Sequence, residues 1–157
     1  MSARVLVVDD IPVNVRLLEA KLSAEYFDVI TASSGAAELE IINSEPPDIV
    51  LLDVMMPEMD GFEVCRRIKS EPATALLPVI MVTALNEQSD RVTGQEAGAD
   101  DFLTIPVRDL ALFARVRSLL RVKMLLDELC LREKTSRQVH TLRDVERRDD
   151  LFHGQKV

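Results

Sequence analysis

The sequence has only two cysteines, no surplus of basic residues and no apolar run long enough to cross a bilayer. Cys65 and Cys130 share no metal-ligand spacing and are too few for a disulfide framework, so we expect two free thiols in a cytoplasmic protein. The formal net charge of −8 argues against a surface that binds nucleic acid. Because a strand-like run begins within the first few residues, we expect no signal peptide. Because no apolar run is long enough to span a bilayer, we expect no membrane insertion.

Short aliphatic runs alternate with segments of helical period along the 157 residues, a length that suits one domain with an appendage. The predicted strands are 4–8, 27–31, 48–53, 78–82 and 102–104, and the predicted helices are 12–25, 34–43, 62–69, 87–97 and a long one from 108 onward. The near-continuous apolar runs are typical of strands buried on both sides. The alternation therefore indicates an α/β fold with a doubly wound, five-stranded parallel sheet.

Acidic and hydroxyl side chains stand where three of these strands end. Asp9 and Asp10 follow the first strand, Asp53 closes the third and Thr83 follows the fourth. In a parallel sheet these ends share one edge, where ligands bind, and clustered carboxylates repel each other unless a cation such as Mg²⁺ lies among them. Taken alone, Asp9 and Asp10 are better explained as an acidic start to the following helix. Together with Asp53 and Thr83, they favour a magnesium site.

Four blocks of the sequence resemble, in order and spacing, the signature blocks of two-component receiver domains: VLVVDDIPVNVRLL, DIVLLDVMMPEMDGFEVCRRIK, PVIMVTA and GADDFLTIP. The resemblance covers about residues 1–125, and we place the receiver domain at 1–122. It implies a (βα)5 flavodoxin-like fold. It also implies a phosphoprotein of two-component signal transduction, whose partner is a histidine kinase or a phosphotransfer protein.

The resemblance also implies roles for single residues. Asp53 would be the phosphoacceptor and would attack a phosphohistidine on the partner. Asp10 would ligate Mg²⁺ directly and Asp9 chiefly through water, with Asp53 and the Met55 carbonyl completing the protein ligands. A carboxylate nucleophile yields an acyl phosphate, and the metal offsets charge on the transferring group, so the chemistry is consistent.

Further residues are implied in the switch that follows phosphorylation. Thr83 would move to hydrogen-bond the phosphoryl oxygen, and Phe102 would be the switch aromatic that changes rotamer after it. Met56-Pro57 and Asp60-Gly61 would form the loop over the site.

The sequence departs from the family's pattern at Ile105, because the pattern has a lysine before Pro106. The missing charge-assisted contact to the phosphoryl group is worth about 1.5–3 kcal/mol. We therefore expect phosphoryl transfer to survive while its coupling to Thr83 and Phe102 is impaired; a receiver biased toward one state and an altered sequence are the alternatives. Arg108 is better explained as an exposed arginine at a helix start than as a substitute. Pro106 suggests a cis peptide bond, as in the family.

Residues 123–157 are predicted to form a helical extension or linker that frays or is disordered toward its end. A seam for another helix is formed by apolar residues that step by three and four: Leu119, Val122, Leu126 and Leu129. Beyond about residue 137 the charge pattern favours a solvated helix, and His140 and His153 are interpreted as surface residues.

The segment LFARVRSLLRVKMLLDEL resembles the first receiver of the PleD-type diguanylate cyclase regulators, in which phosphorylation promotes dimerisation. The resemblance implies a homodimer through the fourth helix, the fifth helix and the extension. No cyclase signature occurs here, so we expect no enzyme activity beyond the chain's own phosphoryl transfer. The main alternative is a scaffold for dimerisation or interaction that works without phosphorylation. A phosphatase of the haloacid type is disfavoured, because Met55 stands where its second acid would be.

Overall fold

The computed structural model describes the backbone of residues 3–84 and 88–154, and the side chains of residues 3–84 and 88–135. Within these residues, strands and helices alternate along the chain. The strands are β1 (Arg4–Val8), β2 (Asp28–Ala32), β3 (Ile49–Asp53), β4 (Val79–Thr83) and β5 (Asp101–Thr104). The helices are α1 (Pro12–Ala24), α2 (Gly35–Ser44), α3 (Gly61–Ser70), α4 (Gln88–Ala97) and α5 (Asp109–Gly154).

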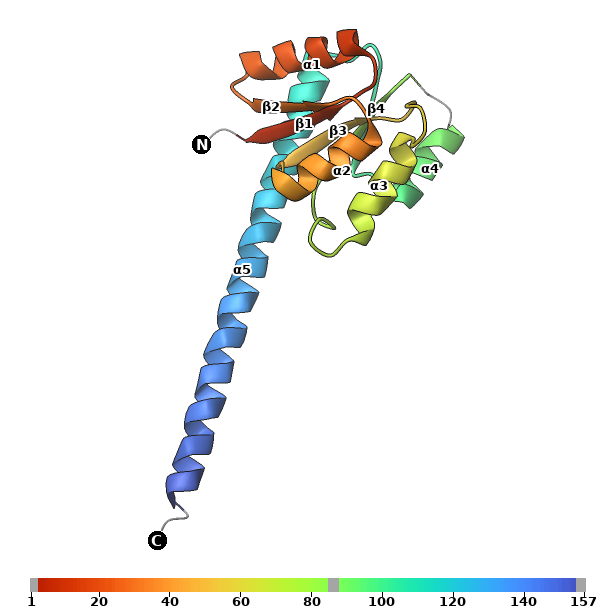
Figure 1. Cartoon of the computed structure of the whole chain (residues 1–157). Coiled ribbons are helices and arrows are strands. Elements are labelled where there is room, and N and C mark those ends of the chain that lie inside the picture. The colour runs from red at the N-terminus through yellow and green to blue at the C-terminus, as the bar shows by residue number, and fades with distance from the viewer. Residues whose placement is uncertain (1–2, 85–87, 155–157) are drawn as a thin grey trace. The chain divides into compact units, whose positions relative to one another are not determined.

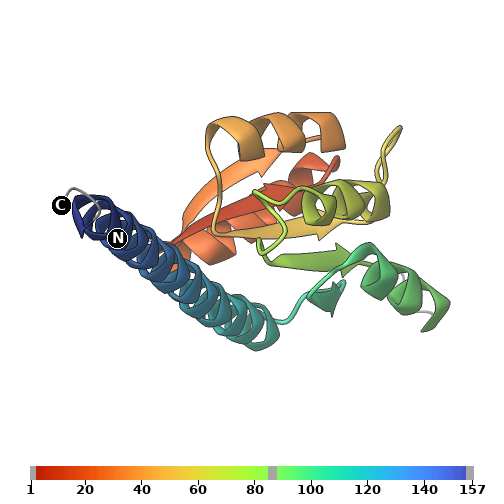
Figure 2. The same ribbon diagram turned by 90° about the horizontal axis from the view of Figure 1, so that it is seen from below.

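All five strands are parallel and lie in the order β2-β1-β3-β4-β5, which can be followed in Figure 2. The register pairs Val8 with Leu52 and Asp53 with Val82, so the carboxyl ends of β1, β3 and β4 lie level with one another. This is the doubly wound α/β sheet that the sequence predicts. It confirms the predicted fold class.

Two separate hydrophobic cores cover the two faces of the sheet, because alternate residues of each strand point to opposite sides. Leu6 and Val8 of β1 face a core that α2, α3 and α4 complete, while Val5 and Val7 face a core that α1 and the first turns of α5 complete. Figure 1 shows α1 on one side of the sheet and α2 and α3 on the other. Burial on both faces explains why β1, β3 and β4 appear in the sequence as continuous apolar runs.

The element boundaries differ from the predicted ones by about one residue, most clearly at β2. Phe27 donates its backbone N–H to the Leu22 carbonyl and so closes the turn after α1 instead of opening the strand. Tyr26 has a φ of 66° in this turn. The predicted start of the fourth helix at residue 87 lies outside the described residues.

The chain divides into two compact units, residues 1–123 and 124–157. Residues 109–123 of α5 belong to the first unit, and the helix accounts for 124–154 of the second. The second unit exposes several large apolar side chains: Met124, Leu125, Leu129 and Leu131. Fraying toward its end stays a prediction, and His140 and His153 lie outside the described side chains. No described helix is both long and apolar enough to cross a membrane.

Candidate acidic site at the carboxyl edge of the sheet

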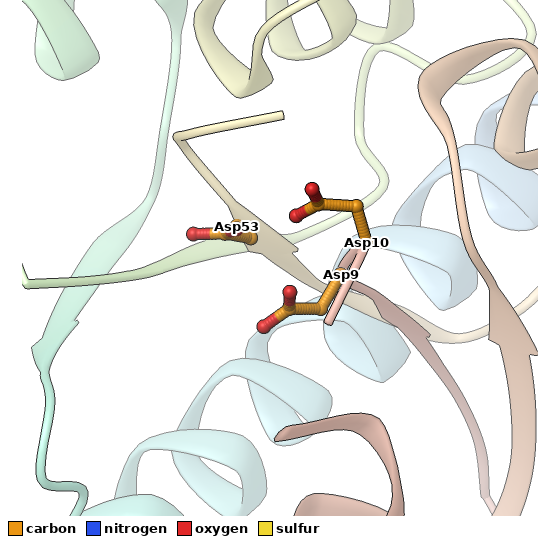
Figure 3. Close-up of side chains that lie close together, drawn as sticks. All are labelled: Asp9, Asp10 and Asp53. Atoms are coloured by element: carbon orange, nitrogen blue, oxygen red, sulfur yellow. The ribbon is translucent and has the colours of Figure 1, made fainter. Parts of the chain in front are cut away.

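Three aspartates meet at the carboxyl edge of the sheet. Asp9 and Asp10 directly follow β1, and Asp53 is the last residue of the neighbouring β3. One carboxylate oxygen from each of the three lies within 4.8 Å of the others. Figure 3 shows the three side chains close together, with their carboxylates directed toward the same side. The parallel register of β1 and β3 produces this cluster.

The three carboxylates are poorly supplied with hydrogen-bond donors. Asp9 is 4% exposed and Asp53 is 8% exposed. The Ile11 N–H donates to Asp9 at 2.9 Å, and the Met55 N–H reaches Asp53 at a long 3.4 Å. Among the described residues, no donor reaches the buried Oδ1 of Asp10. Several acceptor positions are therefore free for a hard cation, and an all-oxygen donor set of this kind fits Mg²⁺.

The electrostatics of Asp53 also favour a cation. Burial raises the pKa of Asp53 to about 6, and the charges of Asp9 and, more weakly, Asp10 act in the same direction. Backbone N–H groups of Met55 and Val54 oppose the rise in pKa without cancelling it. The uncompensated acids therefore raise the cost of ionising Asp53, and a divalent cation among them would remove that cost.

Thr83 and Phe102, the predicted switch pair, line one small cavity together with Val54. Thr83 is 5% exposed at the end of β4. The Phe102 ring lies against Gly94 of α4, where an added Cβ would approach the ring to 2.4 Å. Glycine at position 94 is therefore what admits the ring against α4.

Arg115 is a residue of this region that the sequence reasoning missed. Its guanidinium donates to the Phe102 carbonyl at 2.8 Å and pairs with the Asp101 carboxylate. It therefore fixes the backbone that carries the aromatic side chain. The Arg115 side chain is 42% exposed, and the sequence gives no signal that its guanidinium reaches the Phe102 carbonyl.

Ile105 follows β5 beside the site, and the peptide bond between it and Pro106 is cis, as expected. The Ile105 N–H donates to the Thr83 carbonyl at 3.0 Å. Ile105 and Asp9 line a common cavity of about 130 Å³ with Lys21. The Lys21 ammonium is already engaged, because it pairs with Asp109 at 2.9 Å and donates to a backbone carbonyl.

Arg108 and Met55 have less defined places. Arg108 lines an open groove between α4 and α5, and the lining of this groove includes none of the three aspartates. The Met55 side chain is 64% exposed, and the part its carbonyl plays stays a prediction.

The loop after Asp53 returns tightly over the end of β3. Gly61 donates its N–H to the Val54 carbonyl at 2.9 Å, and a Cβ on Gly61 would lie 2.2 Å from the Asp53 carbonyl oxygen. Asp60 caps α3 by accepting from the Glu63 N–H at 2.9 Å. The Asp60-Gly61 pair thus fixes the loop next to the acidic cluster.

The comparisons with known proteins agree on one family. The response regulator receiver domain matches residues 5–117. The chain is 54% identical over 154 residues to response regulator PleD of Caulobacter vibrioides. The aligned region covers 98% of this chain and 34% of PleD. It is 42% identical over 121 residues to the alkaline phosphatase synthesis transcriptional regulatory protein PhoP of Bacillus subtilis, covering 77% of this chain and 50% of PhoP. The crystal structure of a putative response regulator from Chloroflexus aurantiacus aligns with a TM-score of 0.75 at 35% identity, covering 77% of this chain and 99% of that one.

The chain belongs to the receiver domain family of two-component response regulators, which confirms the resemblance seen in the sequence. The similarity to PleD continues beyond the matched receiver region into the C-terminal helix. The chain spans about a third of the length of PleD and half that of PhoP.

Proposed function

We propose that this receiver accepts a phosphoryl group on Asp53 from a histidine kinase or a phosphotransfer protein, in a reaction that requires Mg²⁺. The observation that carries the proposal is the convergence of three carboxylates from two adjacent strand ends, with an oxygen of Asp10 left without a donor among the described residues. A cluster of this kind adds nothing to a scaffold, because unpaired buried acids are costly.

The residues of the acidic site would have two roles, to bind Mg²⁺ and to supply the nucleophile. Asp10, Asp9, Asp53 and the Met55 carbonyl would hold Mg²⁺, which would offset the negative charge on the transferring group. A carboxylate oxygen of Asp53 attacks the phosphorus, the bond from phosphorus to the partner's histidine nitrogen breaks, and an acyl phosphate forms on Asp53. The Met55 N–H lies 3.4 Å from an Asp53 carboxylate oxygen and contacts it only weakly.

Thr83 and Phe102 would pass the signal on. The two residues line one cavity, so movement of the Thr83 hydroxyl toward a phosphoryl oxygen frees space for the Phe102 ring. At Ile105 an alkyl side chain replaces the lysine of the family's pattern, and Lys21 nearby is held by Asp109. We therefore propose that phosphorylation is coupled weakly to this rearrangement.

The output proposed for the chain is homodimerisation through α4, α5 and the helical extension, or binding of an output partner. α4 and α5 border the groove over β5, and the extension exposes the apolar residues Met124, Leu125, Leu129 and Leu131. A second candidate is a scaffold that dimerises without phosphorylation, and Ile105 is the observation that favours it.

Intact-mass measurement after incubation with Mg²⁺ and acetyl phosphate tests the site. We expect wild type to gain one phosphoryl group and Asp53→Asn to gain none. Asp60→Asn is the matched control, because Asp60 is a nearby acid whose capping role asparagine can fill. Equal uptake by Asp53→Asn and wild type would refute the site assignment.

Size in solution, measured before and after phosphorylation, tests the part given to Ile105. We expect Ile105→Lys to change its assembly state more strongly than wild type at equal phosphoryl content. If both proteins form the same dimer with and without phosphate, the scaffold is the better description.

A further inference from the structure

Glu38 is a buried acid that the phosphorylation chemistry does not use. It lies on α2, is fully buried and has no hydrogen-bond partner on either carboxylate oxygen among the described residues. Burial raises its pKa to about 8. A carboxyl group in this position must be protonated to stay in the interior near neutral pH, because no donor among the described residues bonds to it.

The surroundings of Glu38 are the interface between α2 and α3. Ile42, one helical turn along α2, belongs to the same core as Val64 and Cys65 of α3. Burial raises the pKa of the Cys65 thiol to about 11, and the charge of Glu38 is among the lesser causes, which places the carboxyl near this thiol. Cys65 is itself fully buried.

Among the described residues, no charged group of this interface is bonded to Glu38. On α3, Lys69 is bonded to Asp100. Arg66 and Arg67 both pair with Glu63, although Arg67 also borders a cavity between α2 and α3. On β2, which also packs against α2, the charged residue is Asp28, exposed and paired with Arg4. On α2 itself, Glu40 is exposed.

The N-terminal end of α2 touches the loop of the acidic site. A Cβ added to Gly35 would lie 2.6 Å from Val64 of α3 and 3.3 Å from the sulfur of Met59. Met59 belongs to the loop between Asp53 and α3. A movement of α2 away from α3 would therefore loosen one wall of that loop.

We propose that Glu38 is a proton-controlled latch: protonated, it lets α2 pack on α3, and ionised, it releases α2 from α3 and from Met59. The open state exposes Glu38 to water, where a carboxyl titrates near its ordinary value. At a pH between the ordinary pKa of a carboxyl group and the raised pKa of Glu38 in the closed state, loss of the proton therefore favours opening. The opening equilibrium should rise about tenfold per pH unit up to about pH 8 and level off above it.

The rate at which an uncharged maleimide alkylates Cys65 measures the opening. The experiment uses the Cys130→Ser variant, in which Cys65 is the one remaining thiol. Dividing the labelling rate by that of Glu38→Gln at each pH removes most of the intrinsic pH dependence of the thiol. We expect this ratio to rise about 50-fold from pH 6 to pH 8 and to flatten above about pH 9. Glu40→Gln, measured as a matched control on the same helix, should follow wild type.

Glu38→Ala is a second variant that lacks the carboxyl group, in case Glu38→Gln folds poorly. The rate of Cys65 alkylation should depend on pH in the same way in both variants. Amide exchange, corrected for intrinsic rates, separates a latch from general unfolding: pH-dependent loss of protection should appear in α2 and not in α1. A ratio that stays constant with pH, or equal loss of protection in both helices, would overturn the proposal.

Discussion

Asp53 and Glu38 are both buried acids with raised pKa values, and the difference between them lies in their neighbours. Asp53 stands at the end of a strand beside two other carboxylates, where a cation can reach all three. Glu38 stands inside a helix interface with no polar contact among the described residues. Burial is the first cause of the raised pKa of both groups, but only at Asp53 can a metal remove the cost.

The raised pKa of Asp53 predicts that Asp53→Asn stabilises the metal-free protein. The folded-state pKa of about 6 exceeds the ordinary 3.8, so protonated Asp53 favours folding below pH 3.8 and that contribution is lost as the pH rises through 6. At pH 7.5 we expect Asp53→Asn to raise the free energy of unfolding by about 1–2 kcal/mol, less than the full shift because the edge of the sheet is partly solvated.

Urea unfolding in EDTA at pH 7.5 and pH 5 checks this expectation. The gain should fall to about half at pH 5, where much of the wild-type carboxyl is already protonated in the folded state. A gain that is absent at pH 7.5 would show that Asp53 ionises at no cost in the metal-free protein.

At the scale of elements, the β3–α3 connection fixes the end of β3 that carries Asp53, and Gly61 is its tightest point. In Gly61→Ala the new methyl group would meet the backbone of Asp53 and Val54 at 2.2 and 2.8 Å. Backbone atoms cannot rotate away, so we expect a loss of about 1–3 kcal/mol of unfolding free energy and slower phosphoryl uptake.

Chemical denaturation and the rate of mass gain with acetyl phosphate measure these two effects. Ser70→Ala, at the exposed end of the same helix, is the control and should change neither quantity. Normal uptake in Gly61→Ala would mean that the loop does not set the position of Asp53.

The sequence alone predicted most of the elements, for a physical reason. Strands such as Ile49–Asp53 are buried on both faces and so appear as unbroken apolar runs. The start of β2 was misplaced because Phe27 is as apolar as a strand residue, while its hydrogen bond to Leu22 is visible only in three dimensions.

The candidate site was partly predictable for a related reason. The rule that parallel strands share a carboxyl edge brings Asp9, Asp10 and Asp53 together without any structure. Glu38 was missed, although it lies four residues before Ile42 and so on the same buried side of α2. Helical spacing alone does not reveal that a glutamate points inward, because acids at such positions are usually exposed.

At the scale of the whole chain, the receiver core is complete within the first unit. Leu112, Val116 and Leu120 of α5 close one core, and all three precede residue 123. We therefore expect a chain ending after Lys123 to lose less than about 1 kcal/mol of unfolding free energy and to keep its phosphoryl uptake. If the extension forms the dimer interface, the shortened chain should remain a monomer after phosphorylation while the full chain dimerises.

Denaturation, mass measurement and light scattering on the two chains test these points together. Failure of the shorter chain to fold would contradict the assignment of a self-sufficient core. If the shortened chain still assembles on phosphorylation as the full chain does, the dimer interface lies on α4 and the first turns of α5.

The central claim is that Asp53 receives the phosphoryl group and that Mg²⁺ is needed for it. Its most direct measurement is peptide mass spectrometry of the wild-type protein after acetyl phosphate treatment, with Mg²⁺ or with EDTA. We expect the phosphoryl group on the peptide that contains Asp53, and only when Mg²⁺ is present. A phosphoryl group on another peptide, or equal modification in EDTA, would contradict the account.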